Sequence, residues 1–264
     1  MEFSVVMPVH NEERYLPYSL PSVFKLDPSE VILIFDRCTD RSMEIAEKIS
    51  QRFNFVERTI FVEMNDPSPE WSFRVAFLRR YGFKMAKNDV ILNTDADCIL
   101  DTKIRKYLPL IGRHNIALIS FSRRSYPPTF QDVITTIASL LLPKIGFTGV
   151  YAFSKKAWLE TENEASVKKI IRAEDTHLHL SISKKYKTLF IRTKTIHLRP
   201  EESFSRHYIK GIAYWTIARN PLWKAVLHSF IYFRPMLLAG YLSARFGSCL
   251  NNGYHKASQQ NKYR

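Results

Sequence analysis

The sequence predicts an α/β fold, in which a mostly parallel sheet lies between helices and a basic helical extension follows. Two observations predict the sheet. Strand-like and helix-like segments alternate through the first half of the 264 residues, and 45% of the residues are hydrophobic against 24% charged, as in proteins with an ordinary core. The third observation predicts the extension, because residues 203–264 contain nine Lys and Arg residues and no Asp or Glu.

The first half supplies the alternation that a parallel sheet requires. Short runs rich in β-branched residues predict strands at residues 3–9, 30–35, 56–63, 90–94 and 115–121. The segments between them predict helices at residues 12–25, 40–53, 73–86 and 101–111. Ligands of such sheets bind beyond the carboxyl ends of the strands, so the residues after each strand are the first candidates for a site.

The second half is less regular. It predicts helices at residues 131–142 and 173–185, strands at 150–153 and 188–192, and apolar helical segments at 207–219 and 222–246. The polar residues after 250 are expected to fray.

Glycine and cysteine usage argues against several common kinds of site. The eight glycines form no G-x-G pattern, so a dinucleotide-binding loop and a P-loop are not expected. The three cysteines are odd in number and far apart, which predicts no disulfide framework and a reducing, intracellular setting. The N-terminal residues lead directly into a strand, which predicts no cleavable signal peptide. Because no glycine-rich phosphate-binding loop is expected, the phosphates of a bound nucleotide would most simply be held by a metal ion.

Two carboxylates follow the strand at residues 90–94, in the segment VILNTDADC. Asp95 and Asp97 are two positions apart, so their side chains can converge at the end of an extended segment. A divalent cation would relieve their repulsion, and oxygen ligands favour Mg²⁺ or Mn²⁺. The alternative is a solvated turn that caps the helix beginning near Asp101.

Two other strand ends carry polar residues. The segment VVMPVHNEE ends the first strand at Pro8, and the segment IFDRCTDRS leaves Asp36 at the tip of the second. Asp36 is a candidate for a hydrogen bond to a base or a ribose. The alternative for each segment is an ordinary turn between a strand and a helix, without a role in binding.

The order of these segments resembles family 2 glycosyltransferases of GT-A fold. That family carries a PxxNEE turn, a D-x-(S/C)-T-D turn, an R-N-x-G segment and a DxD metal motif, and MPVHNEE, FDRCTDRS, RRYGF and NTDADC follow the same order here. Arg80 departs from the pattern, because the family usually has Asn at that position. The resemblance is strong over residues 1–100 and looser to about 212.

The resemblance implies a role for each matching residue. Pro8, His10 and Glu12 would line the nucleotide pocket, Asp36 would contact the base, and Arg79 would lie near the diphosphate or the ribose. Asp95 would contact the sugar nucleotide, and Asp95 and Asp97 would hold Mn²⁺ or Mg²⁺, with Asp97 the more direct ligand.

The acceptor side is implied by segments further along the chain. In RAEDTHLHL, Asp175 matches the general base of inverting members, and Glu174 precedes it. Gly149 matches a turn on the acceptor side, and His197 matches a histidine that completes the metal site in some relatives. Without the resemblance, Glu174 and Asp175 would be interpreted as ordinary acidic residues at a helix N-terminus.

The apolar, acid-free extension predicts contact with a membrane surface. Residues 221–247 are long enough to span a bilayer, but Arg234 and Pro235 interrupt the middle. An amphipathic helix or helical hairpin in the interface of an anionic membrane is therefore expected. The alternative is burial in the core or in a dimer interface.

Together these observations predict a GT-A domain at residues 1–212, with a nucleotide-binding half (1–112) and an acceptor half (113–212), and a basic extension at 213–264. We expect inverting, metal-dependent transfer from a nucleotide-diphosphate sugar to an acceptor hydroxyl or phosphate that is lipid-linked or close to a membrane. The protein is expected in the cytoplasm, peripheral on the inner face of the cell membrane. Alternatives are a nucleotidyltransferase, an inactive relative, and a nucleic-acid-binding protein, although no nucleic-acid partner is expected because the excess charge lies on apolar segments.

Overall fold

The computed structural model describes residues 1–67, 70–128, 149–169, 174–199, 204–216, 220–231 and 234–246. The helix predicted at 131–142 and the polar end after residue 250 lie outside these residues. Internal contacts divide the chain into two units, residues 1–201 and residues 202–264, and each unit is described by itself. The predicted domain division at residue 212 stays a prediction.

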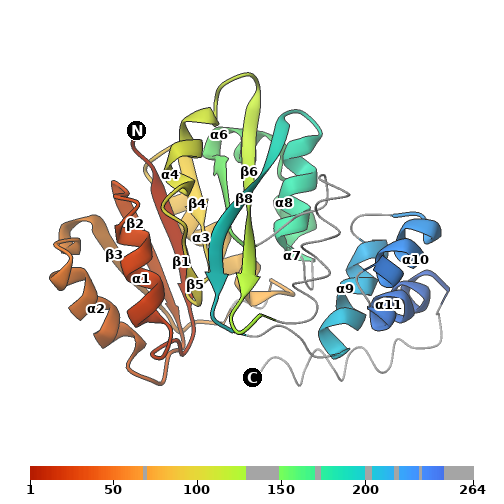
Figure 1. Ribbon diagram of the computed structural model, residues 1–264, viewed down its shortest axis with the longest axis horizontal. Coiled ribbons are helices and arrows are strands. Elements are labelled where there is room, and N and C mark those ends of the chain that lie inside the picture. Colours follow the sequence, from red (N-terminus) through yellow and green to blue (C-terminus); the bar gives the residue numbers. More distant parts are fainter. Residues whose placement is uncertain are drawn as a thin grey trace. The chain divides into compact units, whose positions relative to one another are not determined.

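The first unit is built on one sheet, whose strands lie side by side in Figure 1. The eight strands in the described residues are β1 (Ser4–Val9), β2 (Glu30–Asp36), β3 (Thr59–Met64), β4 (Val90–Asn93), β5 (Cys98–Ile99), β6 (Ile116–Ser125), β7 (Tyr151–Ser154) and β8 (Lys187–His197). Their order in the sheet is β3-β2-β1-β4-β7-β6-β8-β5.

The sheet is mostly parallel, which confirms the predicted fold class. β3, β2, β1 and β4 are parallel neighbours, as are β6 and β8, whereas β7 runs antiparallel between β4 and β6. Consequently β1, β2 and β4 end at the same edge, and the residues that follow them are brought together there.

Helices cover both faces of this sheet. They are α1 (Leu16–Phe24), α2 (Ser42–Arg52), α3 (Arg74–Met85), α4 (Ile104–Tyr107), α6 (Lys155–Thr161), α7 (Glu164–Lys168) and α8 (Glu174–Ser183), with short 3-10 helices at Val56–Arg58 and Leu108–Leu110. In β1, Val5 and Met7 pack in one core cluster with α1, α2 and α4, whereas Val6 packs in a second cluster with α3, α6 and α8. This alternation follows from the two-residue period of a strand.

The structure corrects several of the predicted elements, including three strands. The two-residue strand β5 was not predicted, because a run of two residues has no periodicity. β8 continues to His197, beyond the predicted end at 192, since it pairs with both β6 and β5. Residues Val56–Arg58 form a 3-10 turn rather than the start of a strand, and β3 begins at Thr59, where pairing with β2 begins.

The second unit contains three helices in its described residues, α9 (Phe204–Thr216), α10 (Leu222–Ile231) and α11 (Pro235–Phe246). The segment predicted as helical at 222–246 is thus two helices, and Pro235 is the first residue of the second, a position where its missing N–H costs nothing. Gly211 and Gly240 allow α9 and α11 to pack closely, because a Cβ at either would collide with the backbone of the other helix. No helix among the described residues has the length and apolarity needed to cross a bilayer.

Candidate functional site

Polar residues from four segments meet at the carboxyl edge of the first unit's sheet. Glu12 follows β1, Asp36 is the last residue of β2, Asp95 and Asp97 follow β4, and His197 ends β8. Each of these residues was predicted as part of a site. The structure shows that the short pairing of β5 with β8 is what brings the last of them to the others.

Asp97 and His197 form the most compact part of the site. Cys98 lies opposite His197 in the β5–β8 ladder, and the backbone N–H of Leu198 donates to the Asp97 carbonyl at 2.8 Å. The Nε2 of His197 lies 3.2 Å from Oδ2 of Asp97. Within the described part of the chain, Asp97, Cys98 and His197 form a group of buried potential metal ligands whose donor atoms all lie within 4.8 Å of one another.

The charge state of this group favours Asp97 and His197 over Cys98 as ligands. Burial would raise the pKa of Asp97, but its hydrogen bond with His197 and the charges of His197 and Arg199 hold that pKa below its ordinary value. Burial raises the pKa of the Cys98 thiol well above its ordinary range, so the thiolate that a metal requires is disfavoured. A carboxylate and an imidazole are a donor pair that suits Mn²⁺. The Nδ1 atom of His197 is buried without a hydrogen-bond partner.

Asp95 lies beside two guanidinium groups rather than in this ligand group. Its Oδ1 accepts a hydrogen bond from Nη2 of Arg79, and its Oδ2 lies 3.1 Å from Nη1 of Arg123. Gly149 backs the carboxylate, because a Cβ at that position would lie 2.5 Å from Oδ2 of Asp95 and 3.0 Å from Nη1 of Arg123. The backbone of Gly149 is held in turn by Asn93, whose side chain donates to the Gly149 carbonyl at 2.9 Å.

Arg79 connects Asp95 to the first turn of α8. Its side chain is buried, and its Nη1 donates to the carboxylate of Glu174 while its Nη2 donates to Asp95. Burial raises the pKa of Glu174 above its ordinary value, even though the charge of Arg79 opposes that change.

Asp175 follows Glu174 in α8 and is half-buried. Its Oδ1 accepts a hydrogen bond from its neighbour, the Thr176 backbone N–H, at 2.7 Å. The chain of contacts through Arg79 therefore links the two acidic motifs, Asp95–Asp97 and Glu174–Asp175, which are almost eighty positions apart.

The nucleotide-side candidates lie around the end of β2. Asp36 is buried and accepts hydrogen bonds from Arg74 at 2.8 and 3.0 Å and from Arg37 at 3.2 Å. The exposed ring of His10 lies with Nδ1 2.6 Å from the Asp36 carbonyl oxygen. Pro8 is half-buried within β1.

Glu12 is held at the site by Arg199. Both carboxylate oxygens lie 2.7 Å from Nη2 of Arg199, and the Glu12 backbone N–H donates to Ser42 Oγ at 2.7 Å. Burial raises the pKa of Glu12 to about 7, although the charge of Arg199 acts in the opposite direction. Arg199 Nε also lies 3.5 Å from Oδ2 of Asp97. The same guanidinium group therefore contacts Glu12, which follows β1, and Asp97, one of the potential metal ligands.

Sequence reasoning missed the arginines Arg74, Arg123 and Arg199. Each pairs with a carboxylate at least 28 positions away, so no local spacing indicates the pair. The position of Arg199 two residues after the candidate ligand His197 was the one available signal.

Arg80, which departs from the family pattern, has a structural role in this chain. It is buried and donates to Glu162 at 2.6 and 3.2 Å, and to the backbone carbonyl of Glu174 at 3.2 Å. Arg80 therefore ties α3 to the residue after α6 and to the start of α8, next to Asp175.

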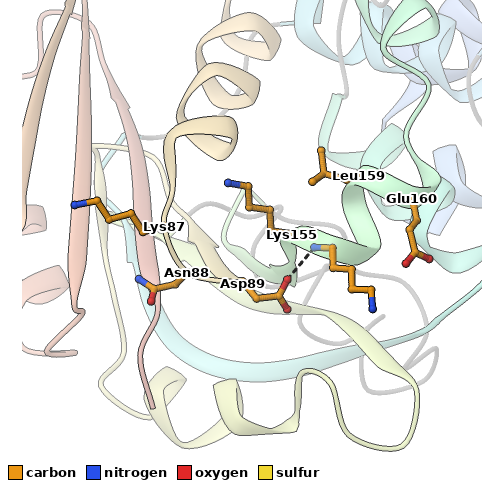
Figure 2. Close-up of a pocket in the computed structure, with 7 residues that line it drawn as sticks. Lys87, Asn88, Asp89, Lys155, Leu159 and Glu160 are labelled. Carbon is orange, nitrogen blue, oxygen red and sulfur yellow. Dashed lines mark hydrogen bonds between the residues drawn. The ribbon is translucent and has the colours of Figure 1, made fainter.

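A separate pocket of about 420 Å³ lies away from this edge, around the loop that precedes β4. Figure 2 shows Asp89 beside Asn88 and below Lys155, and the Asp89 side chain accepts from the Lys156 N–H at 2.8 Å and from Ser154 Oγ at 2.9 Å. Because β4 runs from this loop toward Asp95, the pocket is at the opposite end of the strand. None of the candidate site residues lines it.

Comparison with known proteins identifies the family. Residues 4–141, just over half of the chain, match the family described as Glycosyl transferase family 2. A poly(ribitol-phosphate) beta-N-acetylglucosaminyltransferase, TarS, from Staphylococcus aureus is 29% identical over 110 residues, which is 40% of this chain and 18% of that protein. An uncharacterized glycosyltransferase, the MG025 homolog of Mycoplasma pneumoniae, is 23% identical over 180 residues, 67% of this chain and 54% of that protein. The matched part of the chain thus spans 18% of the first relative's length and 54% of the second's.

Solved structures agree in fold. The mannosyltransferase PcManGT from Pyrobaculum calidifontis, in complex with GDP-Man and Mn²⁺, superposes with a TM-score of 0.64 at 16% identity, covering 100% of this chain and 81% of that one. TarS 1–349 from Staphylococcus aureus gives 0.56 at 15% identity, covering 96% and 74%. The glucosyl-3-phosphoglycerate synthase from Mycobacterium tuberculosis, with Mn²⁺, UDP and phosphoglyceric acid, gives 0.52 at 17% identity, covering 92% and 78%.

Proposed function

Since the chain belongs to glycosyl transferase family 2, we propose that it transfers a sugar from a nucleotide-diphosphate sugar to an acceptor hydroxyl or phosphate, with inversion at the anomeric carbon. The observation that carries this proposal is the buried side chain of Arg79, which contacts Asp95 and Glu174 together. It places the motif predicted for the donor next to the motif predicted for the acceptor, as a direct displacement between the two substrates requires.

On the donor side, we propose that the nucleotide binds beside the ends of β1 and β2, where the predicted nucleotide residues lie. Asp36 is fixed by Arg74, so its carboxylate is positioned to accept a hydrogen bond from the base or the ribose. The exposed His10, with Pro8 and Glu12 on the same turn, would line the nucleotide-binding site. Arg79 contributes by orienting Asp95, and its positive charge lies within the part of the site where the diphosphate would bind.

The proposed metal ligands are Asp97 and His197, whose donor atoms converge at 3.2 Å. The carboxylate fits either Mn²⁺ or Mg²⁺, with water and diphosphate oxygens as further ligands, and the imidazole favours Mn²⁺, because Mg²⁺ prefers oxygen ligands. When bound, the ion would offset the negative charge that develops on the leaving diphosphate. Asp95 also stays a proposed ligand, but it would have to release Arg123 or Arg79 to reach the ion.

On the acceptor side, Asp175 is proposed as the general base. Its carboxylate would accept the proton of the acceptor hydroxyl while the acceptor oxygen attacks the anomeric carbon and the nucleoside diphosphate leaves. Glu174 cannot share this task, because Arg79 occupies its carboxylate in the buried interior. Gly149 is proposed on the same acceptor side, where the absence of a Cβ leaves room for the Asp95 carboxylate and Arg123.

We further propose that the acceptor is lipid-linked or membrane-proximal and that the protein is cytoplasmic and peripheral on the inner face of the cell membrane. The support is the composition of residues 203–264, which carry nine cationic side chains and no Asp or Glu.

A thermal-shift screen of UDP-, GDP-, CDP- and dTDP-sugars, with and without Mn²⁺, tests the donor proposal. We expect one nucleotide class to raise the melting temperature, with a larger rise when Mn²⁺ is present. Asp97→Asn and His197→Gln should each abolish the Mn²⁺-dependent part of the rise. Glu47→Gln, on the exposed face of α2, is the matched control and should behave as the unaltered protein.

Asp175→Asn separates binding from transfer. We expect this variant to keep the donor-dependent thermal shift and to lose release of the nucleoside diphosphate in the presence of an acceptor. If the unaltered chain binds no nucleotide sugar, or if Asp97→Asn responds to Mn²⁺ as the unaltered chain does, the proposed site is wrong.

A further inference from the structure

Helix α10 (Leu222–Ile231) presents an apolar face to solvent. Four of its large side chains are exposed, and their spacing of i, i+3, i+4 and i+7 places them on one side of the helix. They are Trp223 (61% exposed), Val226 (45%), Leu227 (45%) and Phe230 (84%). An exposed apolar surface of this kind on one helix marks a site of interaction. We call these four residues the α10 face.

The opposite side of α10 is anchored in the second unit. Ala225 and Ser229 are buried, and Ser229 Oγ donates to the Arg234 carbonyl at 2.7 Å across the turn to α11. Tyr241 of α11 donates to the Asn220 carbonyl just before α10, also at 2.7 Å. The small residues Ala225 and Ser229 therefore face their own unit, and the four large apolar side chains face outward, whereas a helix that fills a core buries its large apolar side chains.

An exposed cation lies beside the α10 face. It is Lys224, whose Nζ lies 5.6 Å from the ring centroid of Trp223. The sequence from residue 203 onward contains nine Lys and Arg residues and no Asp or Glu. Apolar side chains with Trp at their edge, next to an exposed Lys in a segment that has no acidic residues, match the interface of an anionic bilayer, where acyl chains and lipid phosphates are available together.

We propose that the α10 face docks onto the surface of an anionic lipid bilayer, with α10 lying in the plane of the interface. The helix has ten residues and is therefore about 15 Å long, half of what a bilayer core requires, so it lies on the membrane rather than spanning it. The α10 face would bring the protein to a membrane-proximal acceptor, and in that respect the inference rests on the proposed function. Binding to lipid itself requires no transfer chemistry.

Two other occupants fit less well. A second copy would bring a second acid-free, cationic segment against the first, and like charges would oppose that association. Nucleic acid would be attracted by the charge, but apart from the indole N–H of Trp223 the α10 face offers no hydrogen bonds to phosphate or bases.

Vesicle flotation of the full chain tests the proposal. We expect binding to vesicles of phosphatidylcholine with about one third phosphatidylglycerol, and weak binding to phosphatidylcholine alone. The double variant Trp223→Ser/Phe230→Ser should reduce binding to the anionic vesicles at least tenfold, because both residues supply most of the inserted apolar area. Val56→Ser, which alters an exposed apolar residue of the first unit (48% exposed), is the matched control and should leave binding unchanged.

The electrostatic part of the proposal is tested by Lys224→Glu, which should weaken binding to anionic vesicles severalfold and leave the small affinity for phosphatidylcholine unaltered. Far-UV circular dichroism should be unchanged in every variant, because all the altered side chains are exposed. The proposal is overturned if the unaltered chain fails to float with anionic vesicles, or if the double variant floats as well as Val56→Ser.

Two further measurements distinguish the alternatives. If light scattering after gel filtration shows a dimer that the double variant dissociates, the α10 face is a self-association surface and the membrane proposal is wrong. Retention on RNA that depends on Trp223 and Phe230 would overturn it as well. The double variant should keep the thermal shift with nucleotide sugars, so failure of membrane docking and failure of the proposed transferase activity give different results.

Discussion

Arg79 and Glu174 form a buried ion pair that joins α3 to the first turn of α8. The same guanidinium contacts Asp95 with its other terminal nitrogen, so a single side chain fixes the relative positions of the two acidic motifs. A buried ion pair adds little stability by itself. We therefore interpret the pair as a positioning device whose removal leaves an unpaired buried charge.

Arg79→Met should lower the free energy of unfolding by about 3–5 kcal/mol, because Glu174 would stay buried without its partner. Urea unfolding followed by circular dichroism measures the change. Arg41→Met removes the cation of an exposed pair with Glu13 and should change the same free energy by less than about 1 kcal/mol. Equal losses in the two variants would contradict a special role for Arg79.

Gly149→Ala should weaken donor binding more than it weakens the fold. The new Cβ would lie 2.5 Å from the Asp95 carboxylate, so Asp95 must move away from Arg123. We expect at least a tenfold loss of affinity for the nucleotide sugar, about 1.4 kcal/mol, in a calorimetric titration.

Gly112→Ala is the control for Gly149. Gly112 has a positive φ of 87° and open space around its Cα, so alanine there should cost about 1 kcal/mol of stability through backbone strain and leave donor affinity unchanged. If both variants lose donor affinity equally, close packing at Gly149 is not the cause.

Arg80→Asn would place the usual family residue at the position where this chain departs from the pattern, and it should be harmful here. Glu162 would be left buried with only Trp158 as a hydrogen-bond partner, which should lower the free energy of unfolding by about 3–5 kcal/mol. Arg80→Met with Glu162→Met should recover most of that loss, because neither charge would then remain buried. Failure of the double variant to recover would show that the hydrogen bond of Arg80 to the Glu174 carbonyl is what matters.

The ionisation of Glu12 should make stability depend on pH. Burial raises its pKa from 4.5 to about 7 in the folded chain, so the folded state binds the proton more tightly than the unfolded state. The stabilisation is present in full below about pH 4.5 and is lost as the pH rises to 7. In EDTA, the unfolding free energy of the unaltered chain relative to Glu12→Gln should therefore fall between pH 4.5 and 7 and stay level above pH 8. A difference that rises over this interval would contradict the assignment.

Most of the first unit's fold followed from local patterns. The strands β1, β2 and β4 were predicted because runs of apolar residues, alternating or continuous, indicate which residues a sheet buries. The exceptions involve pairing between distant segments. β5 has two residues and exists because β8 pairs with it. The extra length of β8 depends on its pairing with both β5 and β6, so neither strand has a signal in its own residues.

The sequence by itself determined which residue types stand at the strand ends, including Asp36, Asp95 and Asp97, and at the start of α8, where the Glu174–Asp175 pair lies, because these residues lie within short motifs of fixed spacing. Only the tertiary structure decided how those charges are neutralised. Arg79 pairs with Glu174 across 95 positions and Arg199 with Glu12 across 187, and the identity of an arginine's partner depends on which segments the sheet brings into contact. A charge can be recognised from sequence, but its partner is set by strand order and register.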